Sequence, residues 1–201
     1  EEAEKARLAA EEEKRKSEEE AEQARKAAEE SIVLLKNDGH ILPLNKSAKV
    51  AVIGDFAKTP RYQGAGSSVV NPTRLETALD IIEKYPLELT GFAAGYRRTG
   101  PPDAALEQEA VSLAKKADVV LLYIGLDEIS ESEGLDRKNM KLPASQIQLL
   151  EKISKANPHV VAVMSAGSAV EMPWLGQCEA LIHGYLSGQA GASAMLNAIT
   201  G

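Results

Sequence analysis

The central segment of this chain reads ADVVLLYIGLDEISESEGLDRKNMKLP (residues 117–143). Its apolar run, Val119 to Ile124, is short and uninterrupted, which is typical of a strand buried on both faces. The loop after this run carries five carboxyl groups, namely Asp127, Glu128, Glu131, Glu133 and Asp136. Ligands of open α/β sheets bind at the carboxyl ends of the strands. The loop is therefore either the source of an acid or base catalyst or an ordinary solvated connection.

Strand and helix patterns alternate on both sides of this segment. Apolar runs predict further strands at 50–53, 87–92, 160–164 and 180–185. Apolar residues at helical spacing predict helices at 73–84, 104–117, 144–156 and 189–199, the first of them with Thr73 and Glu76 as a capping box. Continuous apolar strands separated by helices indicate an α/β fold, a mostly parallel sheet between two helical layers.

The amino-terminal segment, residues 1–30, has a different composition. It holds twelve Glu, no Asp and seven Lys or Arg, so it carries −5 of the total formal charge of −7. Nearly all its residues are strong helix formers, and pairs such as Glu11 with Arg15 lie at helical spacing. We expect a solvated, charged helical leader or linker over 1–30 and a folded domain over 31–201. The apolar face of SIVLLKN, from Ser31, predicts that this helix enters the fold and ends near Asp38.

Composition argues against several classes of protein. Basic residues are not clustered with aromatic ones, which argues against nucleic-acid binding. Every apolar run is shorter than the ~18 residues of a membrane span. The single Cys178 leaves no intrachain disulfide, and the three histidines lack ligand spacing, so we expect no metal site. GAGSS (64–68) does not complete a dinucleotide fingerprint, and no cofactor is expected.

Several segments, in this order, are similar to one family. They are SIVLLKNDGHILPL, VAVIGD, GAGSS, ADVVLLYIGLDEISESEGLDR, KLPASQIQLLEKI, VVAVMSAGSAVEMPWL and HGYLSGQAGASAMLNAITG. Together they resemble the α/β sandwich domain of glycoside hydrolase family 3, which includes many β-glucosidases and β-xylosidases. The resemblance covers about residues 29–201 and implies hydrolysis of O-glycosidic bonds in a carbohydrate substrate. It also implies a partner, a (β/α)₈ barrel domain that supplies an aspartate nucleophile. Nothing in this chain resembles that barrel, and we expect a truncated sandwich domain that is inactive alone.

The resemblance also implies an acid/base residue. The family pattern of a Glu before Gly, followed by Asp-Arg, falls on Glu133, Gly134, Asp136 and Arg137. This assigns the acid/base role to Glu133. Glu131 is the rival candidate, because two residues of an extended loop point in opposite directions and only one of these carboxyl groups then faces the sugar. A third interpretation is that both merely solvate the loop.

Two further sites are candidates for substrate binding. GAGSS resembles the Gly-rich loop that lies on the active-site side in family 3, so Ser67 or Ser68 is expected to donate to a sugar hydroxyl; a plain turn is the alternative. Arg137 either shapes the loop or positions a substrate hydroxyl through its planar donors. Two functions stay open: the acid/base-bearing domain of a retaining β-glycosidase, and a non-catalytic α/β binding or scaffold module.

Overall fold

The computed structural model describes residues 2–201, which build a single six-stranded sheet. The strands are β1 (Val33–Asn37), β2 (Ala48–Ile53), β3 (Leu87–Ala93), β4 (Val119–Gly125), β5 (Val160–Ser165) and β6 (Ala180–His183). Their order in the sheet is β1-β6-β5-β4-β2-β3, and every neighbouring pair is parallel except β1 with β6. The predicted mostly parallel sheet is confirmed.

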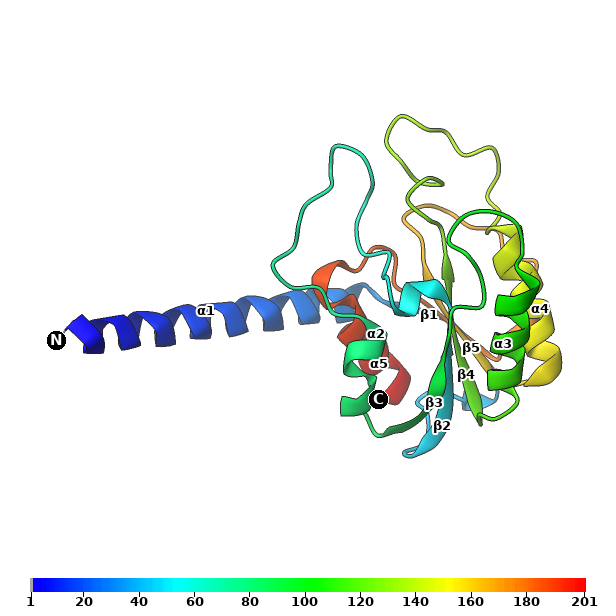
Figure 1. Cartoon of the computed structure of the whole chain (residues 1–201), viewed down its shortest axis with the longest axis horizontal. Helices are drawn as coiled ribbons and strands as arrows, with labels where there is room; N and C mark the ends of the chain where they lie inside the picture. Colours follow the sequence, from blue (N-terminus) through cyan, green and yellow to red (C-terminus); the bar gives the residue numbers. More distant parts are fainter. Residues whose placement is uncertain (1) are drawn as a thin grey trace.

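Helices cover both faces of the sheet, as Figure 1 shows. One layer contains α3 (Ala104–Ala114) and α4 (Ala144–Ala156), and the other contains α2 (Ala78–Ile81) and α5 (Gly191–Thr200). Short 3₁₀ turns lie in the segments between strands and helices: η1 (Asp38–His40), η2 (Asp55–Ala57), η3 (Ile82–Lys84), η4 (Leu175–Gln177) and η5 (Gly188–Ala190). Because β4 lies in the middle of the sheet, all seven of its residues are buried, as its unbroken apolar run predicts. The three-layer sandwich is confirmed.

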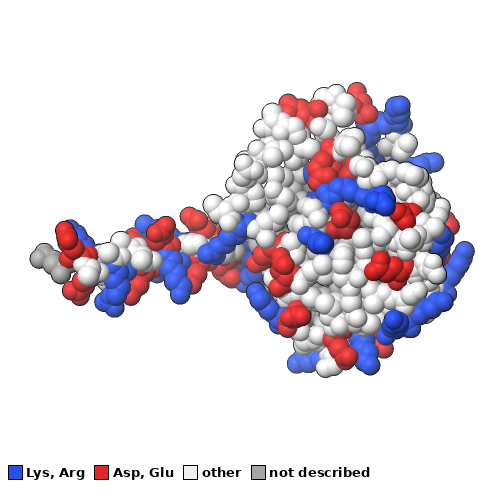
Figure 2. Space-filling view, viewed as in Figure 1, with Lys and Arg blue, Asp and Glu red and all other residues white. Residues whose placement is uncertain are grey.

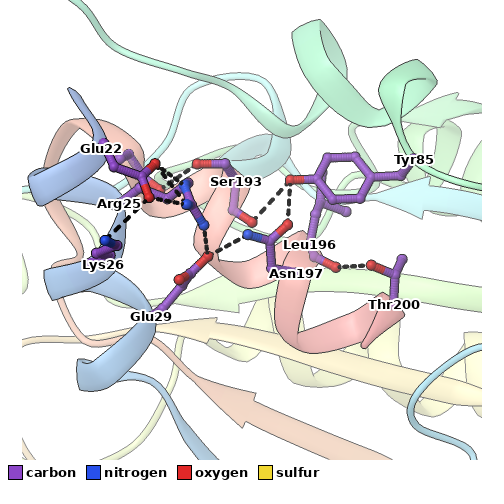
Figure 3. A network of polar contacts seen from close by, with 10 residues as sticks. Glu22, Arg25, Lys26, Glu29, Tyr85, Ser193, Leu196, Asn197 and Thr200 are labelled. Atoms are coloured by element: carbon purple, nitrogen blue, oxygen red, sulfur yellow. Dashed lines mark hydrogen bonds and ion pairs between the residues drawn. The ribbon is translucent and has the colours of Figure 1, made fainter. Parts of the chain in front are cut away.

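The charged amino-terminal segment forms one long helix, α1 (Glu2–Ser31), which projects from the domain. Residues 2–16 are exposed, and their acidic and basic side chains alternate along the rod in Figure 2. Only the last third of α1 contacts the domain, where Ala28 is buried. Figure 3 shows the polar side of this contact: Arg25 pairs with Glu29, and Glu29 accepts a hydrogen bond from Asn197 of α5. The Tyr85 hydroxyl donates a hydrogen bond to the side-chain oxygen of Asn197, with 2.9 Å between Oη and Oδ1.

The prediction that SIVLLKN continues the helix is wrong. Helix α1 ends at Ser31, and residues 33–37 form β1, which pairs antiparallel with β6. The free edge of β6 offers backbone hydrogen bonds to Val33 and its neighbours, and this pairing outweighs the helical spacing of their side chains. The side chains that looked like an apolar helix face, such as Leu34 and Leu35, are largely exposed on this edge strand.

The predicted helix at 73–84 is much shorter than expected. Helix α2 begins at Ala78, and its N-cap is Thr77, whose Oγ1 accepts from the Asp80 amide at 3.2 Å. The capping box of Thr73 with Glu76 is therefore wrong. The Glu76 amide instead donates to the Gln189 carbonyl oxygen at 3.1 Å, which draws residues 73–76 across to the start of α5.

Two long loops rise from the carboxyl edge of the sheet. One leaves β2 and spans residues 58–77, and the other leaves β4 and spans residues 126–143 (Figure 1). The second loop begins at Gly125, where φ is +157° and an added Cβ would lie 1.8 Å from the carbonyl oxygen of Ser165 in β5. Only glycine allows the two strands to approach this closely where the loop starts.

Other parts of residues 2–201 have structural roles. Trp174 and Cys178 are buried in the core on the α3 and α4 side. Burial raises the pKa of the Cys178 thiol to about 12, so the thiol is protonated and unreactive at neutral pH. Across this described part, histidine, cysteine and carboxylate side chains form no cluster suited to a metal ion. No helix within the same residues is both long and apolar enough to cross a membrane.

Candidate active site

The two long loops at the carboxyl edge of the sheet, residues 58–77 and 126–143, are called the rim loops here, and they meet at Glu133. Ala65 of the first loop and Ser132 of the second form an isolated parallel bridge, and the Glu133 amide donates to the Ala65 carbonyl oxygen at 3.3 Å. The side chain of Glu133 then reaches back, and its Oε2 accepts from the Ser67 amide at 2.7 Å. The structure thus brings together two of the residues predicted from the sequence, one from each loop.

The backbone conformation of Gly66 makes this contact possible. Gly66 has φ +97°, and a Cβ at this position would lie 2.6 Å from the Cβ of Glu133 and 2.9 Å from its Oε2. A side chain would collide with the carboxylate and would also strain the backbone. Glycine is therefore required at position 66, because it lets the chain turn its backbone amides toward Glu133.

Glu133 is exposed and ionised in this chain. The Ser67 hydroxyl and backbone amide hold the pKa of the Glu133 carboxyl below its ordinary value, because both stabilise the charged form. A general acid needs the opposite shift, since it must hold its proton near neutral pH. The carboxyl group is placed at the rim, but its present surroundings favour a base.

Glu131 has different surroundings from Glu133. Its side chain is only 9% exposed, and both oxygens are occupied. Oε2 accepts from the Gly167 amide at 2.9 Å, and Oε1 accepts from the Ser168 hydroxyl at 2.5 Å. Arg61 lies nearby, with Nη2 3.8 Å from Oε2. Glu131 would have to break these contacts to meet a substrate, so its geometry fits a residue that anchors the loop.

Arg137 contacts the same region as Glu131. Its Nη1 donates to the Ser168 hydroxyl and to the Ala169 carbonyl oxygen, each at 2.7 Å. Ser168 is thus shared between Glu131 and Arg137, which ties the β4 loop to the loop after β5. Asp136 forms no ion pair with any residue in 2–201, and Ser68 is exposed. Of the predicted set, Ser67 alone has a hydrogen bond to Glu133 within residues 2–201, whereas Glu131 and Arg137 bond to the loop after β5.

An open hollow of about 430 Å³ lies beside Glu131 and Arg137. Its lining includes Arg61, Gly64 and Leu186 but neither Glu133 nor Ser67. The rim therefore offers a shallow surface with a carboxylate at its margin. Small-molecule sites are concave and bury most of their ligand, so this surface would need a second wall to enclose a sugar.

Large apolar side chains stand exposed on the same rim. They are Val69, Val70, Ile129, Leu135, Met140 and Tyr185. Val70 is 64% and Ile129 66% exposed, one on each of the two loops that meet at Glu133. Residues 62–73 of the first loop carry no charged side chain, and this loop forms the white ridge in the upper part of Figure 2. An apolar rim around a carboxylate is typical of a surface that another protein surface covers.

Sequence reasoning missed a second charged group at this edge. Arg98 follows β3, and its Nε lies 2.8 Å from Asp55 Oδ2 after β2, while its Nη1 lies 2.6 Å from Glu128 Oε1 after β4. The guanidinium also lies over the Phe56 ring at 4.7 Å. The sequence positions could have indicated this cluster. Arg98, Asp55 and Glu128 each follow the carboxyl end of one of three adjacent parallel strands, and these ends lie at one edge of the sheet.

Comparison with known proteins now decides the family. The profile described as Glycosyl hydrolase family 3 C-terminal domain matches residues 32–201. The chain belongs to glycosyl hydrolase family 3. This confirms the resemblance drawn from the sequence segments.

Named relatives of this family 3 domain are enzymes that act on glycosides. An exo-α-(1→6)-L-arabinopyranosidase of Bifidobacterium breve is 46% identical over 182 residues, covering 85% of this chain and 24% of that protein. Thermostable β-glucosidase B of Acetivibrio thermocellus is 40% identical over 174 residues, covering 85% of this chain and 23% of that protein. The chain thus spans about a quarter of the length of these curated relatives.

A solved structure shows the same fold. The family 3 β-glucosidase of Bifidobacterium adolescentis superposes with a TM-score of 0.85 at 46% identity, covering 89% of this chain and 26% of that one. The family 3 domain described here therefore corresponds to one part of a larger enzyme in its relatives.

Proposed function

We propose that this domain supplies the acid/base carboxyl group, Glu133, to a retaining β-glycosidase. The nucleophile comes from a (β/α)₈ barrel domain that docks on the rim formed by the two loops. The observation that carries this proposal is the position of Glu133: an exposed carboxylate, fixed by the Ser67 amide, on loops that also carry exposed apolar side chains.

The chemistry explains why the site is divided between two surfaces. A retaining glycosidase needs two carboxyl groups ~5–5.5 Å apart, one to attack the anomeric carbon and one to protonate the leaving oxygen. Glu131, the nearest carboxyl in sequence, has both oxygens engaged with Gly167 and Ser168. Glu131 is thus unsuited to be the second carboxyl group, which in this proposal comes from the barrel domain.

Docking of the barrel domain also raises the pKa of Glu133, as general acid catalysis requires. Covering the rim removes water from Glu133, and desolvation raises the pKa of a carboxyl group. A negatively charged nucleophile brought close would raise it further. Ser67 opposes this rise because it lowers the pKa of Glu133, so it favours the carboxylate that acts as base in the second step. In the domain alone Glu133 is ionised, and in the complete site it is protonated.

The substrate class follows from the relatives' names. These names are exo-α-(1→6)-L-arabinopyranosidase, thermostable β-glucosidase B and probable exo-1,4-β-xylosidase. We propose β-linked glucosides or related pyranosides as substrates. The choice among these sugars lies with the docking domain, because the hollow on this chain is open and shallow.

The test is a chimera in which this chain replaces the corresponding domain of the Bifidobacterium breve relative. Aryl β-glucoside and aryl α-L-arabinopyranoside hydrolysis is measured for the chimera and for the chain alone. We expect turnover only in the chimera, and a fall in kcat/KM of about 10²- to 10⁴-fold in Glu133→Gln, since that is the usual worth of a general acid.

The matched control is Glu109→Gln, which removes an exposed carboxyl group on α3 that forms no ion pair within residues 2–201. It should change kcat/KM by less than about tenfold, since surface substitutions away from the site have small effects. A Glu133→Gln chimera as active as the parent would rule out the acid/base assignment. A folded chimera with no turnover at all would favour the non-catalytic scaffold.

A further inference from the structure

Arg61 is a buried charge between two hollows. Only 2% of the residue is exposed, although its loop lies on the surface. On one side it lines the open hollow that also contains Glu131. On the other side it lines an inner cavity of about 30 Å³, which reaches Tyr123 of β4 and the first residues of α5. A guanidinium in this position separates the rim from the core.

The charge of Arg61 is only partly satisfied by protein atoms. Its nearest anionic partner is Glu131, at 3.8 Å from Nη2 to Oε2, which is longer than a direct hydrogen bond. Nε and Nη2 have no hydrogen-bond partner among residues 2–201. Burying a charged group without hydrogen bonds is costly, so something must bond to these nitrogens.

The inner cavity offers a solution. Two more buried polar atoms that face no partner in the described residues belong to its lining, Tyr123 Oη and Glu76 Oε2. Arg61 can only donate, the Glu76 carboxylate can only accept, and the tyrosine hydroxyl does both. Water both donates and accepts, so it can bond to all three groups, whereas an anion would be repelled by Glu76. A water needs roughly 10–15 Å³ of such space, so the cavity suits about two.

Arg61 also connects the two loops of the candidate active site. It lies in the same loop as Ser67, and its ionic partner Glu131 lies two residues before Glu133. Glu131 is fixed in turn by Gly167 and Ser168, so the second loop has a firm base at this point. Arg61 does not contact Glu133 itself, and any effect on it must pass through Glu131 and the loop backbone.

We propose that Arg61 is the positioning residue for Glu133. It joins the two rim loops by holding Glu131 on one side and about two ordered waters on the other, and these waters bridge it to Glu76 and Tyr123. The catalytic meaning of this role rests on the function proposed for Glu133. The physical linkage does not, and it is measurable in this chain without a partner.

The first test follows the Glu133 carboxyl by ¹³C NMR titration in the full 201-residue chain. Arg61→Met keeps an apolar stem of similar length but removes the charge. We expect the pKa of Glu133 to rise toward the ordinary value, because the loop no longer presents Ser67 to it. Amide exchange of residues 128–137 should accelerate at least about tenfold, as expected for a released loop.

Two further variants keep this test decisive. Glu131→Gln retains an acceptor for Gly167 and a partner for Ser168 but loses the charge that faces Arg61, and it should shift Glu133 in the same direction. Arg97→Met is the matched control, because Arg97 is exposed and, within residues 2–201, its ion-pair partner is Asp103. If Arg61→Met does not fold, Glu131→Gln carries the test alone. A folded variant with unchanged Glu133 pKa and unchanged exchange would overturn the proposal.

The second test identifies what fills the inner cavity. High-resolution crystals grown in bromide should show density within hydrogen-bond distance of Arg61 Nε, Tyr123 Oη and Glu76 Oε2, without a bromide anomalous signal. An anomalous peak there would mean an anion, and a cavity without density would mean that Arg61 has no water partners. Either result would contradict the bridging role.

In the chimera, Arg61→Met should lower kcat about 10- to 100-fold with little change in KM, the range expected for a misplaced catalytic group. The double variant with Glu131→Gln should be no worse than Arg61→Met alone, because both act through one contact. If the kcat losses of Arg61→Met and Glu131→Gln added in the double variant, the two residues would not act through one contact. An inactive parent chimera would refute the proposed function and leave the NMR result standing.

Discussion

The carboxylate of Glu133 and the backbone amide of Ser67 form a 2.7 Å hydrogen bond between two loops that leave different strands of the sheet. The bond gives an exposed side chain a fixed place at the carboxyl edge of a parallel sheet, which is where ligands of such folds bind. It also sets the protonation state of that side chain before any partner arrives.

Removing the Ser67 hydroxyl should change the titration of Glu133. In Ser67→Ala we expect the pKa of Glu133 to rise but to stay below its ordinary value, because the hydroxyl is the larger cause of the depression and the backbone amide remains. Ser68→Ala should leave the titration unchanged. Carboxyl ¹³C shifts of the two variants, measured against the parent chain, check both expectations.

The pH dependence of the loop contact follows from the same shift. The pKa of Glu133 is lowered in the folded chain, so the contact contributes fully above the ordinary Glu pKa and is lost as the pH falls through the lowered value. The amide shift of Ser67 should therefore titrate with the midpoint of Glu133. A Ser67 amide that is insensitive to pH across this window would show that the bond does not form in solution.

Gly66 should be the least replaceable residue of the GAGSS loop. Gly66→Ala places a Cβ 2.6 Å from that of Glu133 and strains a backbone with φ +97°. The strain amounts to roughly 1–3 kcal/mol. We expect the carboxylate to be displaced, with its pKa returning toward the ordinary value and the amides of both loops exchanging faster.

Gly134→Ala is the matched control for Gly66. Gly134 also has a positive φ, +76°, but an added Cβ there meets no atom within 4 Å. Backbone strain alone should then act, without a collision. Equal effects of the two substitutions on Glu133 would contradict the packing argument.

Helix α1 should contribute to stability only through its last third. A version of the chain beginning at Ser17 should melt at the parent temperature, because residues 2–16 are exposed and bury nothing. A version beginning at Glu29 loses buried Ala28 and the ion pair of Arg25 with Glu29, so it should melt several degrees lower. Thermal melting followed by circular dichroism separates these outcomes, and equal melting of all three would mean that the contact with α5 is not stabilising.

Much of the fold could be predicted from the sequence. Long periodic or uninterrupted apolar segments, such as 119–124 and 144–156, form the predicted elements almost residue for residue. The two misses share one cause. The strand residues of SIVLLKN pair with β6, and the Glu76 amide bonds to the Gln189 carbonyl oxygen, and no local spacing reveals such distant partners.

The candidate site was predictable only in part. Family resemblance pointed to Glu133 and to Ser67, and the structure places them in contact. Arg61 escaped notice because a single arginine in a loop normally looks solvated, and its burial arises from a fold that closes over it. The different surroundings of Glu131 and Glu133 likewise depend on Gly167 and Ser168, which lie more than thirty positions away in the sequence.

The most direct test of the account measures how kcat/KM of the Glu133→Gln chimera depends on the leaving group of aryl β-glucosides. A general acid matters most for poor leaving groups, so the loss should be small for dinitrophenyl glucoside and should grow to about 10²- to 10⁴-fold for phenyl glucoside. A loss of the same size for every leaving group would contradict proton donation by Glu133.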